Sequence, residues 1–143
     1  LEGATRLMGM KRNETSTLIW MAGVVVAHLV ITLVHGSAHA QAQVPLSPAA
    51  TVFVFGVILG GPLIGMGLAW PARRAGAGLV ALTMAGALVF GIVNHFMLSS
   101  PDHIAHVDPQ WRALFTTTAV LLAETEALGS VLAIRILRER RLV

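Results

Sequence analysis

Residues 17–39 read TLIWMAGVVVAHLVITLVHGSAH, an apolar stretch without Lys, Arg, Asp or Glu. Crossing the roughly 30 Å hydrocarbon core of a bilayer takes about 20 helical residues, and this stretch is long enough. Its polar side chains include three histidines, His28, His35 and His39. The stretch therefore predicts a transmembrane helix that carries imidazoles along its length.

Three more apolar stretches follow at about 51–70, 76–99 and 113–137. The chain of 143 residues is 55% hydrophobic and 12% charged, with a mean hydropathy of +0.75, which excludes an ordinary soluble domain. Backbone polar groups in lipid must bond within their own segment, so we expect these stretches to be helices. We predict an all-α integral membrane four-helix bundle with up-down-up-down topology, in which residues 1–143 form a single transmembrane domain.

Basic residues predict the orientation of this bundle. They precede the first helix, lie between the second and third, and close the fourth, whereas residues 40–50 and 100–111 contain none. The residues concerned are Arg6, Lys11, Arg12, Arg73, Arg74, Arg135, Arg138, Arg140 and Arg141. By the positive-inside rule both termini are cytoplasmic, and the histidine-containing loops lie on the non-cytoplasmic side of the plasma (inner) membrane. Basic residues dispersed at helix ends do not indicate a nucleic-acid partner.

An alternative interpretation of the N-terminal region stays open. A basic pair at residues 11–12, the apolar run and an A-x-A sequence at residues 38–40 also resemble a secretory signal with its cleavage site, which would leave three spans. The run is longer than the roughly 7–15 apolar residues of such a signal, and His28 interrupts it, which favours the membrane helix. Residues 1–9 are expected to precede the native start at Met10.

Local signals predict where helices begin, bend and touch. Asn13 or Thr15 can cap the first helix, and Asp108 followed by Pro109 can start the last. Pro62 is expected to kink the second helix. The glycines of residues 56–65 recur at small-xxx-small spacing, which favours close helix packing inside the bundle over a dedicated dimer interface.

The absence of cysteine limits any metal site to imidazole and oxygen ligands. His35 and His39 are four residues apart, so both imidazoles can converge on one ion. His28 lies on the same stripe but roughly 10 Å deeper along the helix, which is too far for a shared metal bond of about 2 Å. We therefore assign His28 to a different layer.

Three further histidines are expected at the depth of His35. His95 lies about one turn below the outer end of the third helix, and His103 and His106 follow in the loop, where Asp102 or Asp108 can serve as a carboxylate ligand or orient an imidazole. The predicted metal ligands are His35, His39, His95, His103, His106 and Asp102. Three or four imidazoles suffice to hold copper, zinc or iron. The competing interpretation is that the loop histidines only cap helix ends or are solvated.

Two glutamates are predicted near the middle of the membrane, where an ionisable residue is costly and indicates function. Glu124 and Glu126 are two residues apart and therefore cannot both face one point in the bundle. Thr117 shares the stripe of Glu124, so we expect Glu124 to face inward. His28 lies at a similar depth, and we expect it to pair with one glutamate. Such a pair would be a proton relay, a brace behind the metal ligands, or only a buried polar pair that fixes helix register.

Three functions are consistent with this pattern. The first is a non-haem metal site at the outer membrane face, for metal handling or metal-dependent oxidation. The second is a haem- or pigment-binding subunit of a respiratory or photosynthetic complex, with His95 and either His28 or His35 as axial ligands. The third is a small proton-coupled transporter subunit that uses Glu124 and His28. Besides the lipid bilayer, a homo-oligomer or a larger membrane complex is expected as partner.

Overall fold

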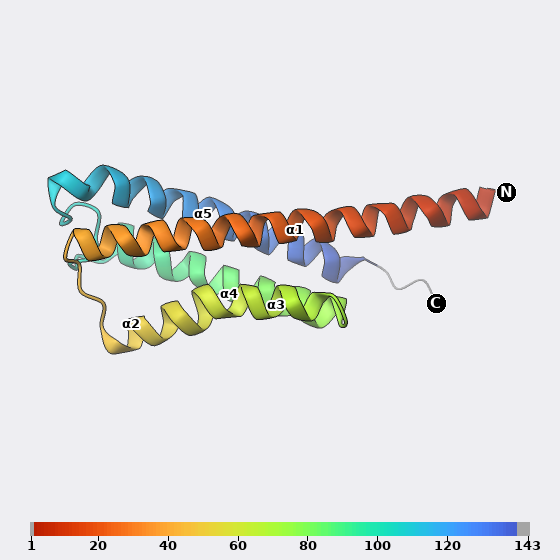
Figure 1. Cartoon of the computed structure of the whole chain (residues 1–143), viewed down its shortest axis with the longest axis horizontal. Helices are drawn as coiled ribbons and strands as arrows, with labels where there is room; N and C mark the ends of the chain where they lie inside the picture. Colours follow the sequence, from red (N-terminus) through yellow and green to blue (C-terminus); the bar gives the residue numbers. More distant parts are fainter. Residues whose placement is uncertain (1, 140–143) are drawn as a thin grey trace.

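A computed structural model describes residues 2–139, with side chains from residue 15 onward, and the described chain is helical without any β-strand. Its elements are α1 (Glu2–Gln41), α2 (Pro48–Phe53), the π-helix η1 (Val54–Gly60), α3 (Gly61–Ala69), α4 (Arg73–Ile92), the π-helix η2 (Val93–Met97) and α5 (Pro109–Arg138). The segments α2, η1 and α3 follow one another without a break, and η2 continues α4. Figure 1 shows the long helical segments lying lengthwise beside one another.

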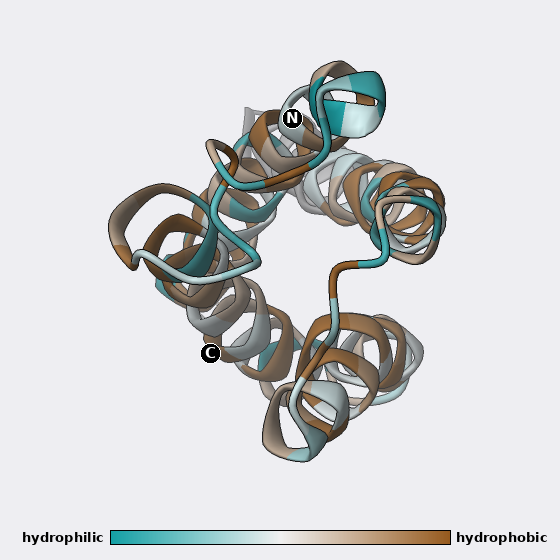
Figure 2. Ribbon diagram, turned by 90° about the vertical axis from the view of Figure 1, so that its left-hand side faces the viewer, coloured by the Kyte–Doolittle hydropathy of each residue, from teal (hydrophilic) through white to brown (hydrophobic). Residues whose placement is uncertain are grey.

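α5 is central to the packing of these segments. It packs against both α1 and α4, while α3 packs against α4 and makes few contacts with α1. Viewed from one end, the helical segments are arranged in a ring (Figure 2). Within it α1 and α3 are joined less closely than the other neighbouring helices.

Three helical segments are long and apolar enough to cross a membrane among the residues that the structure describes. They are Thr15–Gln41, Pro48–Ala69 and Arg73–Met97, with mean hydropathies of 2.3, 2.2 and 2.1. Large apolar side chains face outward on them, such as Trp20, Phe55 and Leu82, which are 68%, 65% and 73% exposed. Three long helices with large apolar side chains exposed on them suggest a membrane protein.

The helix ends agree with the prediction at one place and differ at another. Asp108 caps α5 through its side chain, which accepts from the Gln110 amide at 2.8 Å, and Pro109 follows as predicted. The first helix, however, begins at Glu2, so the prediction that Asn13 or Thr15 caps it is wrong. The residues before Thr15 are mostly good helix formers without proline, and they continue the helix beyond its apolar part.

Pro62 changes the second segment through its missing amide hydrogen. It lies in the first turn of α3, directly after η1, and has no N–H to donate to the carbonyl of Ile58 four residues earlier. The Ile58 carbonyl instead accepts from His28 Nε2 of α1 at 3.2 Å. The bond links α1 to η1 at the point where the regular helix pattern is interrupted.

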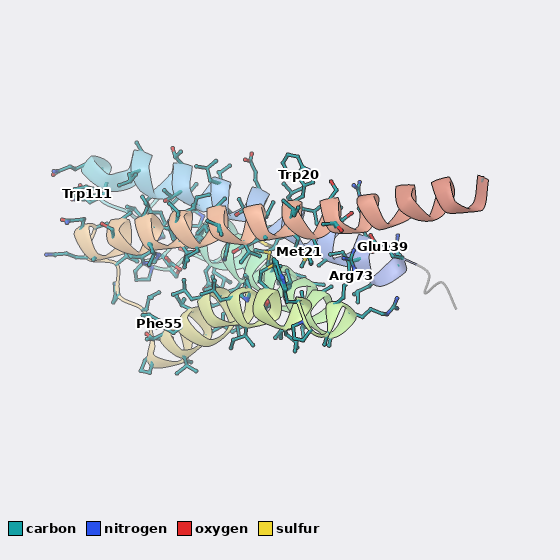
Figure 3. The ribbon with its side chains drawn as sticks, turned by 45° about the vertical axis from the view of Figure 1, so that its right-hand side comes forward. Trp20, Met21, Phe55, Arg73, Trp111 and Glu139 are labelled. Atoms are coloured by element: carbon teal, nitrogen blue, oxygen red, sulfur yellow. The ribbon has the colours of Figure 1, made fainter. Side chains whose placement is uncertain are left out.

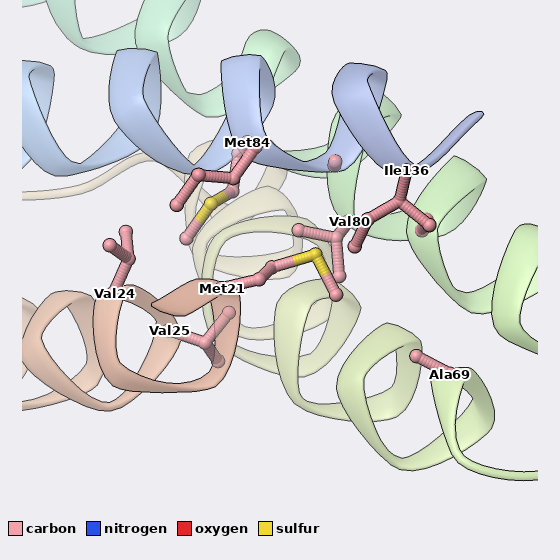
Figure 4. Close-up of a cluster of buried hydrophobic side chains, with 10 residues drawn as sticks. Met21, Val24, Val25, Ala69, Val80, Met84 and Ile136 are labelled. Carbon is pink, nitrogen blue, oxygen red and sulfur yellow. The ribbon is translucent and has the colours of Figure 1, made fainter. Parts of the chain in front are cut away.

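The core is built from apolar side chains and close glycine contacts. Met21, Val25, Val80, Met84 and Ile136 are buried against one another between α1, α4 and α5 (Figure 4). Glycines of α3 touch α4: a Cβ added at position 61 would meet the Thr83 side chain, and one at position 65 would meet Val80. Gly61 and Gly65 therefore serve packing within the chain, as predicted, whereas a Cβ at position 56 would meet no atom within 4 Å.

An ion pair connects α4 and α5 at the end of the molecule opposite the histidines. Arg73 at the start of α4 donates to the Glu139 carboxylate after α5 at 2.6 Å (Figure 3). Arg74 donates to the Glu139 backbone carbonyl at 3.1 Å. These contacts tie the ends of α4 and α5 together.

Candidate metal centre

Three histidines from two helices converge in the structure. His35 and His39 lie four residues apart on α1, and His95 comes from η2. Each offers one ligand nitrogen, and these nitrogens all lie within 4.8 Å of one another. The three side chains are buried, with 6%, 9% and 7% of their residues exposed. We call this group the histidine cluster; it is close enough to hold a metal ion.

The hydrogen bonds of His35 fix which of its nitrogens is free. Its Nδ1 lies 2.8 Å from Thr118 Oγ1. The Thr118 hydroxyl donates its own hydrogen to the Leu114 carbonyl at 2.8 Å, so it accepts from His35. His35 therefore carries its hydrogen on Nδ1, and the lone pair of Nε2 remains available.

The same reasoning applies to His95. Its Nδ1 lies 3.1 Å from the backbone carbonyl of Asp102, which can only accept, so Nδ1 donates and Nε2 carries a lone pair. The Nε2 atoms of His35 and His95 are 3.3 Å apart. Two lone pairs at this distance repel unless a cation lies between or beside them. Metal–nitrogen bonds of about 2 Å at tetrahedral angles put neighbouring nitrogens about 3.4 Å apart, which the observed distance matches.

Asp102 lies beside the cluster, with only 8% of the residue exposed. Its Oδ1 is 3.2 Å from His39 Nε2 and 3.3 Å from His95 Nδ1. Burial alone would raise the pKa of Asp102, but the hydrogen bond with His95 and the electrostatic effect of the neighbouring imidazoles outweigh it and lower the pKa below its ordinary value. The carboxylate is therefore held ionised beside the imidazoles.

The polar atoms of the cluster are not all satisfied. Among the described residues, His39 Nδ1 and Asp102 Oδ1 are buried without a partner in hydrogen-bond geometry. Buried polar groups are rarely left in that state, and each exception needs an explanation. A bound cation is one explanation, because it would coordinate a lone pair of His39 and compensate the charge of Asp102.

Apolar side chains isolate the cluster from water. The Phe115 ring of α5 contacts the rings of His35, His39 and His95 at centroid distances of 4.7, 4.7 and 5.2 Å. Phe115 itself packs with Ala38, Val44 and Val107 in a second buried cluster, with Trp111 against it. Electrostatic interactions are stronger in such a dry environment than in water.

A π-helical turn places His95. Within η2 the helix widens, and the Leu98 amide bonds to the Val93 carbonyl at 2.8 Å, five residues back. The Asn94 side chain donates to the Phe90 carbonyl at 2.8 Å. The loop that follows is fastened to this turn, because the Ile104 amide donates to the His95 carbonyl at 3.0 Å. Single π-helical turns often occur at functional sites.

His103 and His106 lie outside the histidine cluster. Their ring centroids are 5.4 Å apart. His103 Nδ1 accepts from the Ala105 amide at 3.1 Å, and His106 Nδ1 donates to the Ser100 carbonyl at 2.7 Å. Both rings thus stabilise turns of the loop, and Asp108 caps α5. Of the five histidines predicted at one depth, the structure brings three together.

The prediction that Glu124 faces inward is wrong. Glu124 is exposed and Glu126 is buried, with 3% of the residue exposed. The stripe that α5 buries contains Thr118, Leu122 and Glu126, whereas Thr117, which had pointed to Glu124, is exposed. Helical periodicity identifies the buried face of α5 only if one residue of that face is already known. The sequence has three successive threonines, and it does not show which of them is buried.

His28 does not meet either glutamate among the described contacts. Besides the Ile58 carbonyl, its ring nitrogens lie 3.4 Å from Thr32 Oγ1 and 3.5 Å from Thr125 Oγ1. The ring is buried in its own layer, as the depth argument predicts, but it is bonded to hydroxyls and to η1. The expected pair between His28 and a glutamate is therefore replaced by the bond from His28 to the Ile58 carbonyl, which residue spacing in the sequence does not predict.

A cavity of about 370 Å³ extends from the histidine cluster into the fold. All three histidines and Asp102 line it at one end, and Glu126 also lines it. The walls between them are apolar and include Leu33, Phe55, Phe90 and Leu122. Its volume falls within the roughly 300–1,000 Å³ of small-molecule sites, so the centre is adjacent to space for a ligand.

No family model, no curated protein and no solved structure matches this chain. The chemistry of the site is therefore inferred from its own geometry.

Proposed function

We propose that the chain is an integral membrane protein that binds one transition-metal ion at His35, His39 and His95. Copper, zinc and iron are the candidates, because all three accept imidazole ligands. Asp102 orients His95 and His39 and compensates the charge of the ion, as carboxylates behind metal-bound imidazoles do. His103 and His106 are not needed for this centre.

One observation carries the proposal. The Nε2 atoms of His35 and His95 face each other at 3.3 Å while Thr118 and the Asp102 carbonyl accept from the other nitrogen of each ring. This arrangement orients two lone pairs toward one point, which is unfavourable for the protein alone and favourable with a cation. A merely structural histidine pair would donate from one ring to the other.

The proposal includes the predicted topology of four spans with both termini cytoplasmic. α5 supplies the fourth span, although Glu124 and Glu126 make it less apolar than the others. Basic side chains at one end support the orientation: Arg73, Arg74, Arg135 and Arg138. Arg112 lies at the other end, where its guanidinium donates to the carbonyls of Ala105 and Val107. The metal centre is then near the non-cytoplasmic face of the plasma membrane.

The cavity beside the cluster favours metal-dependent chemistry on an apolar molecule over metal storage alone. Storage requires ligands only, whereas a reaction requires room next to the ion. The proton-relay alternative and the haem alternative that pairs His28 with His95 both need His28, which does not line the cavity and is hydrogen-bonded elsewhere. No described contact favours them.

Metal loading tests the proposal. We expect the chain, purified in detergent and dialysed against Zn²⁺, Cu⁺ or Fe²⁺, to retain one ion per chain of at least one of these metals, as measured by elemental analysis. Co²⁺ should give visible d–d bands of a nitrogen-coordinated site. A Soret band in the protein as purified would instead support the haem alternative, and a chain that retained none of the ions would contradict the proposal.

Thr118 offers a test of how His35 is oriented. In Thr118→Val, a change of nearly equal shape, the His35 Nδ1–H loses its acceptor, and we expect metal affinity to fall about 10- to 100-fold, as for other partners of metal-bound imidazoles. A competition titration with a chelator measures this change. Thr117→Val is the matched control, because Thr117 is exposed next to it. Equal affinities in the two variants would show that Thr118 does not orient the ligand.

A further inference from the structure

Glu126 is a buried residue whose carboxyl group bonds to none of the side chains that the structure describes. Only 3% of the residue is exposed, and it lines the cavity. Ser130 Oγ donates to the Glu126 backbone carbonyl at 2.8 Å, but no described residue between 15 and 139 bonds to the carboxyl group. A polar group in such an apolar environment is costly unless something satisfies it.

No described contact joins the carboxyl group to another polar side chain that lines the cavity. Thr118, which supports the histidine cluster, precedes Glu126 by eight residues on α5, which corresponds to about 12 Å along the helix. The Thr32 hydroxyl also lines the cavity, where it donates to the His28 carbonyl of its own helix at 2.8 Å, and no described contact joins it to Glu126. A molecule that enters the cavity can therefore supply the partner of the carboxyl group.

The route into the cavity leads from the lipid-facing surface. Leu33 of α1 and Phe55 of η1 both line the cavity, and they are 60% and 65% exposed. Gly36, on the next turn of α1, also lines it and is exposed. Few contacts join α1 and α3. A molecule dissolved in the hydrocarbon can enter here without crossing water.

We propose that this cavity binds a bilayer-soluble alcohol, with its hydroxyl on the Glu126 carboxyl group and its apolar body directed toward the histidine cluster. A hydroxyl both donates and accepts, so it satisfies a carboxyl group in either protonation state. A cationic amine would bring a second costly charge into the membrane. The apolar walls, Phe90 and Leu122 among them, match a hydrocarbon chain or ring. The inference rests on the proposed function in that it names the substrate class of the same site.

Photolabelling in a bilayer tests the proposal. The probe is hexadecanol with a diazirine in its chain, added to the full chain in phosphatidylcholine nanodiscs, and labelled residues are mapped by mass spectrometry. We expect saturable labelling at Leu33, Phe55 and their neighbours in the cavity. At equal mole fraction in the bilayer, 1-dodecanol should compete about tenfold better than dodecane, because only the alcohol can bond to Glu126.

Two pairs of variants sharpen the test. Gly36→Leu should reduce saturable labelling about tenfold by filling the mouth of the cavity. Gly23→Leu is the control on the same helix, since a Cβ at either position meets no atom within 4 Å. Glu126→Leu should abolish the preference for the alcohol, whereas Glu126→Gln, which still donates and accepts, should retain it. If Glu126→Leu did not fold, the comparison of dodecanol with dodecane on the unchanged chain would still decide.

Three outcomes would overturn the inference: equal competition by dodecane, stronger competition by dodecylammonium, or labels scattered over the whole lipid-facing surface. The labelling is carried out on both metal-free and metal-loaded protein. Metal binding without cavity labelling would refute the alcohol site alone. Cavity labelling in a protein that binds no metal would refute the proposed function alone.

Discussion

Replacing His35 by alanine is expected to lower the affinity for the metal ion at least about a hundredfold, more than the loss of a hydrogen-bond partner behind a ligand does. His35 has the shortest contact to a second imidazole and connects α1 to α5 through Thr118. Without it the two remaining histidines hold an ion with one ligand fewer, and His95 Nε2 loses its neighbour. A competition titration with a chelator of known affinity measures the loss.

The control for this prediction is His103→Ala, which removes an imidazole from the adjacent loop. His103 lies outside the histidine cluster, so the metal affinity of the His103→Ala variant should stay within about threefold of that of the unchanged chain. The helical circular dichroism of both variants should match that of the parent. An affinity that falls equally in both variants would mean that the loop, and not the buried cluster, binds the ion.

Replacing Gly76 by alanine is expected to have the largest effect on stability. Gly76 lies where α4 begins to pack on α3, and an added Cβ would lie closer than van der Waals contact to the backbone of Ala69 and 2.5 Å from the Gly65 carbonyl oxygen. Backbone atoms cannot turn aside as a flexible side chain does, so the two helices must move apart. We expect a loss of about 3 kcal/mol or more in the free energy of unfolding.

Gly78→Ala is the matched control, two residues farther along α4. A Cβ at position 78 meets no atom within 4 Å, and alanine favours a helix over glycine by about 1 kcal/mol. This variant should therefore be as stable as the parent or slightly more stable. Unfolding in mixed detergent micelles measures both variants, and equal stabilities would contradict the close approach of α3 and α4.

The apolar helices were predictable from the sequence because the length and hydropathy of a stretch depend only on its own residues and not on how the helices pack. The stretches at 17–39, 51–70 and 76–99 coincide with the three segments that are apolar and long enough to cross a membrane. The two π-helices were not predictable, because a single extra residue per turn leaves no mark on hydropathy. Pro62 indicated a distortion, but the bond from His28 to the Ile58 carbonyl depends on how α1 lies against η1.

The histidine cluster was partly predictable for a similar reason. The rise per residue put His35, His39 and His95 at one depth, and the structure brings them together with Asp102. The positions of His103 and His106 depend on the path of an irregular loop, and such a loop has no regular repeat from which side-chain directions can be predicted. For Glu126 a signal did exist: Leu122, Gly129 and Ala133 mark the same stripe, and they identify the buried face better than a run of threonines does.

X-ray absorption at the edge of the bound metal tests the central claim most directly. For the loaded chain we predict three imidazole nitrogens at about 2.0–2.1 Å, with the outer-shell scattering of histidine rings. The same spectrum of His95→Ala should show fewer imidazoles. A first shell made of oxygen ligands alone, without scattering from imidazole rings, would contradict the assignment of a metal centre to His35, His39 and His95.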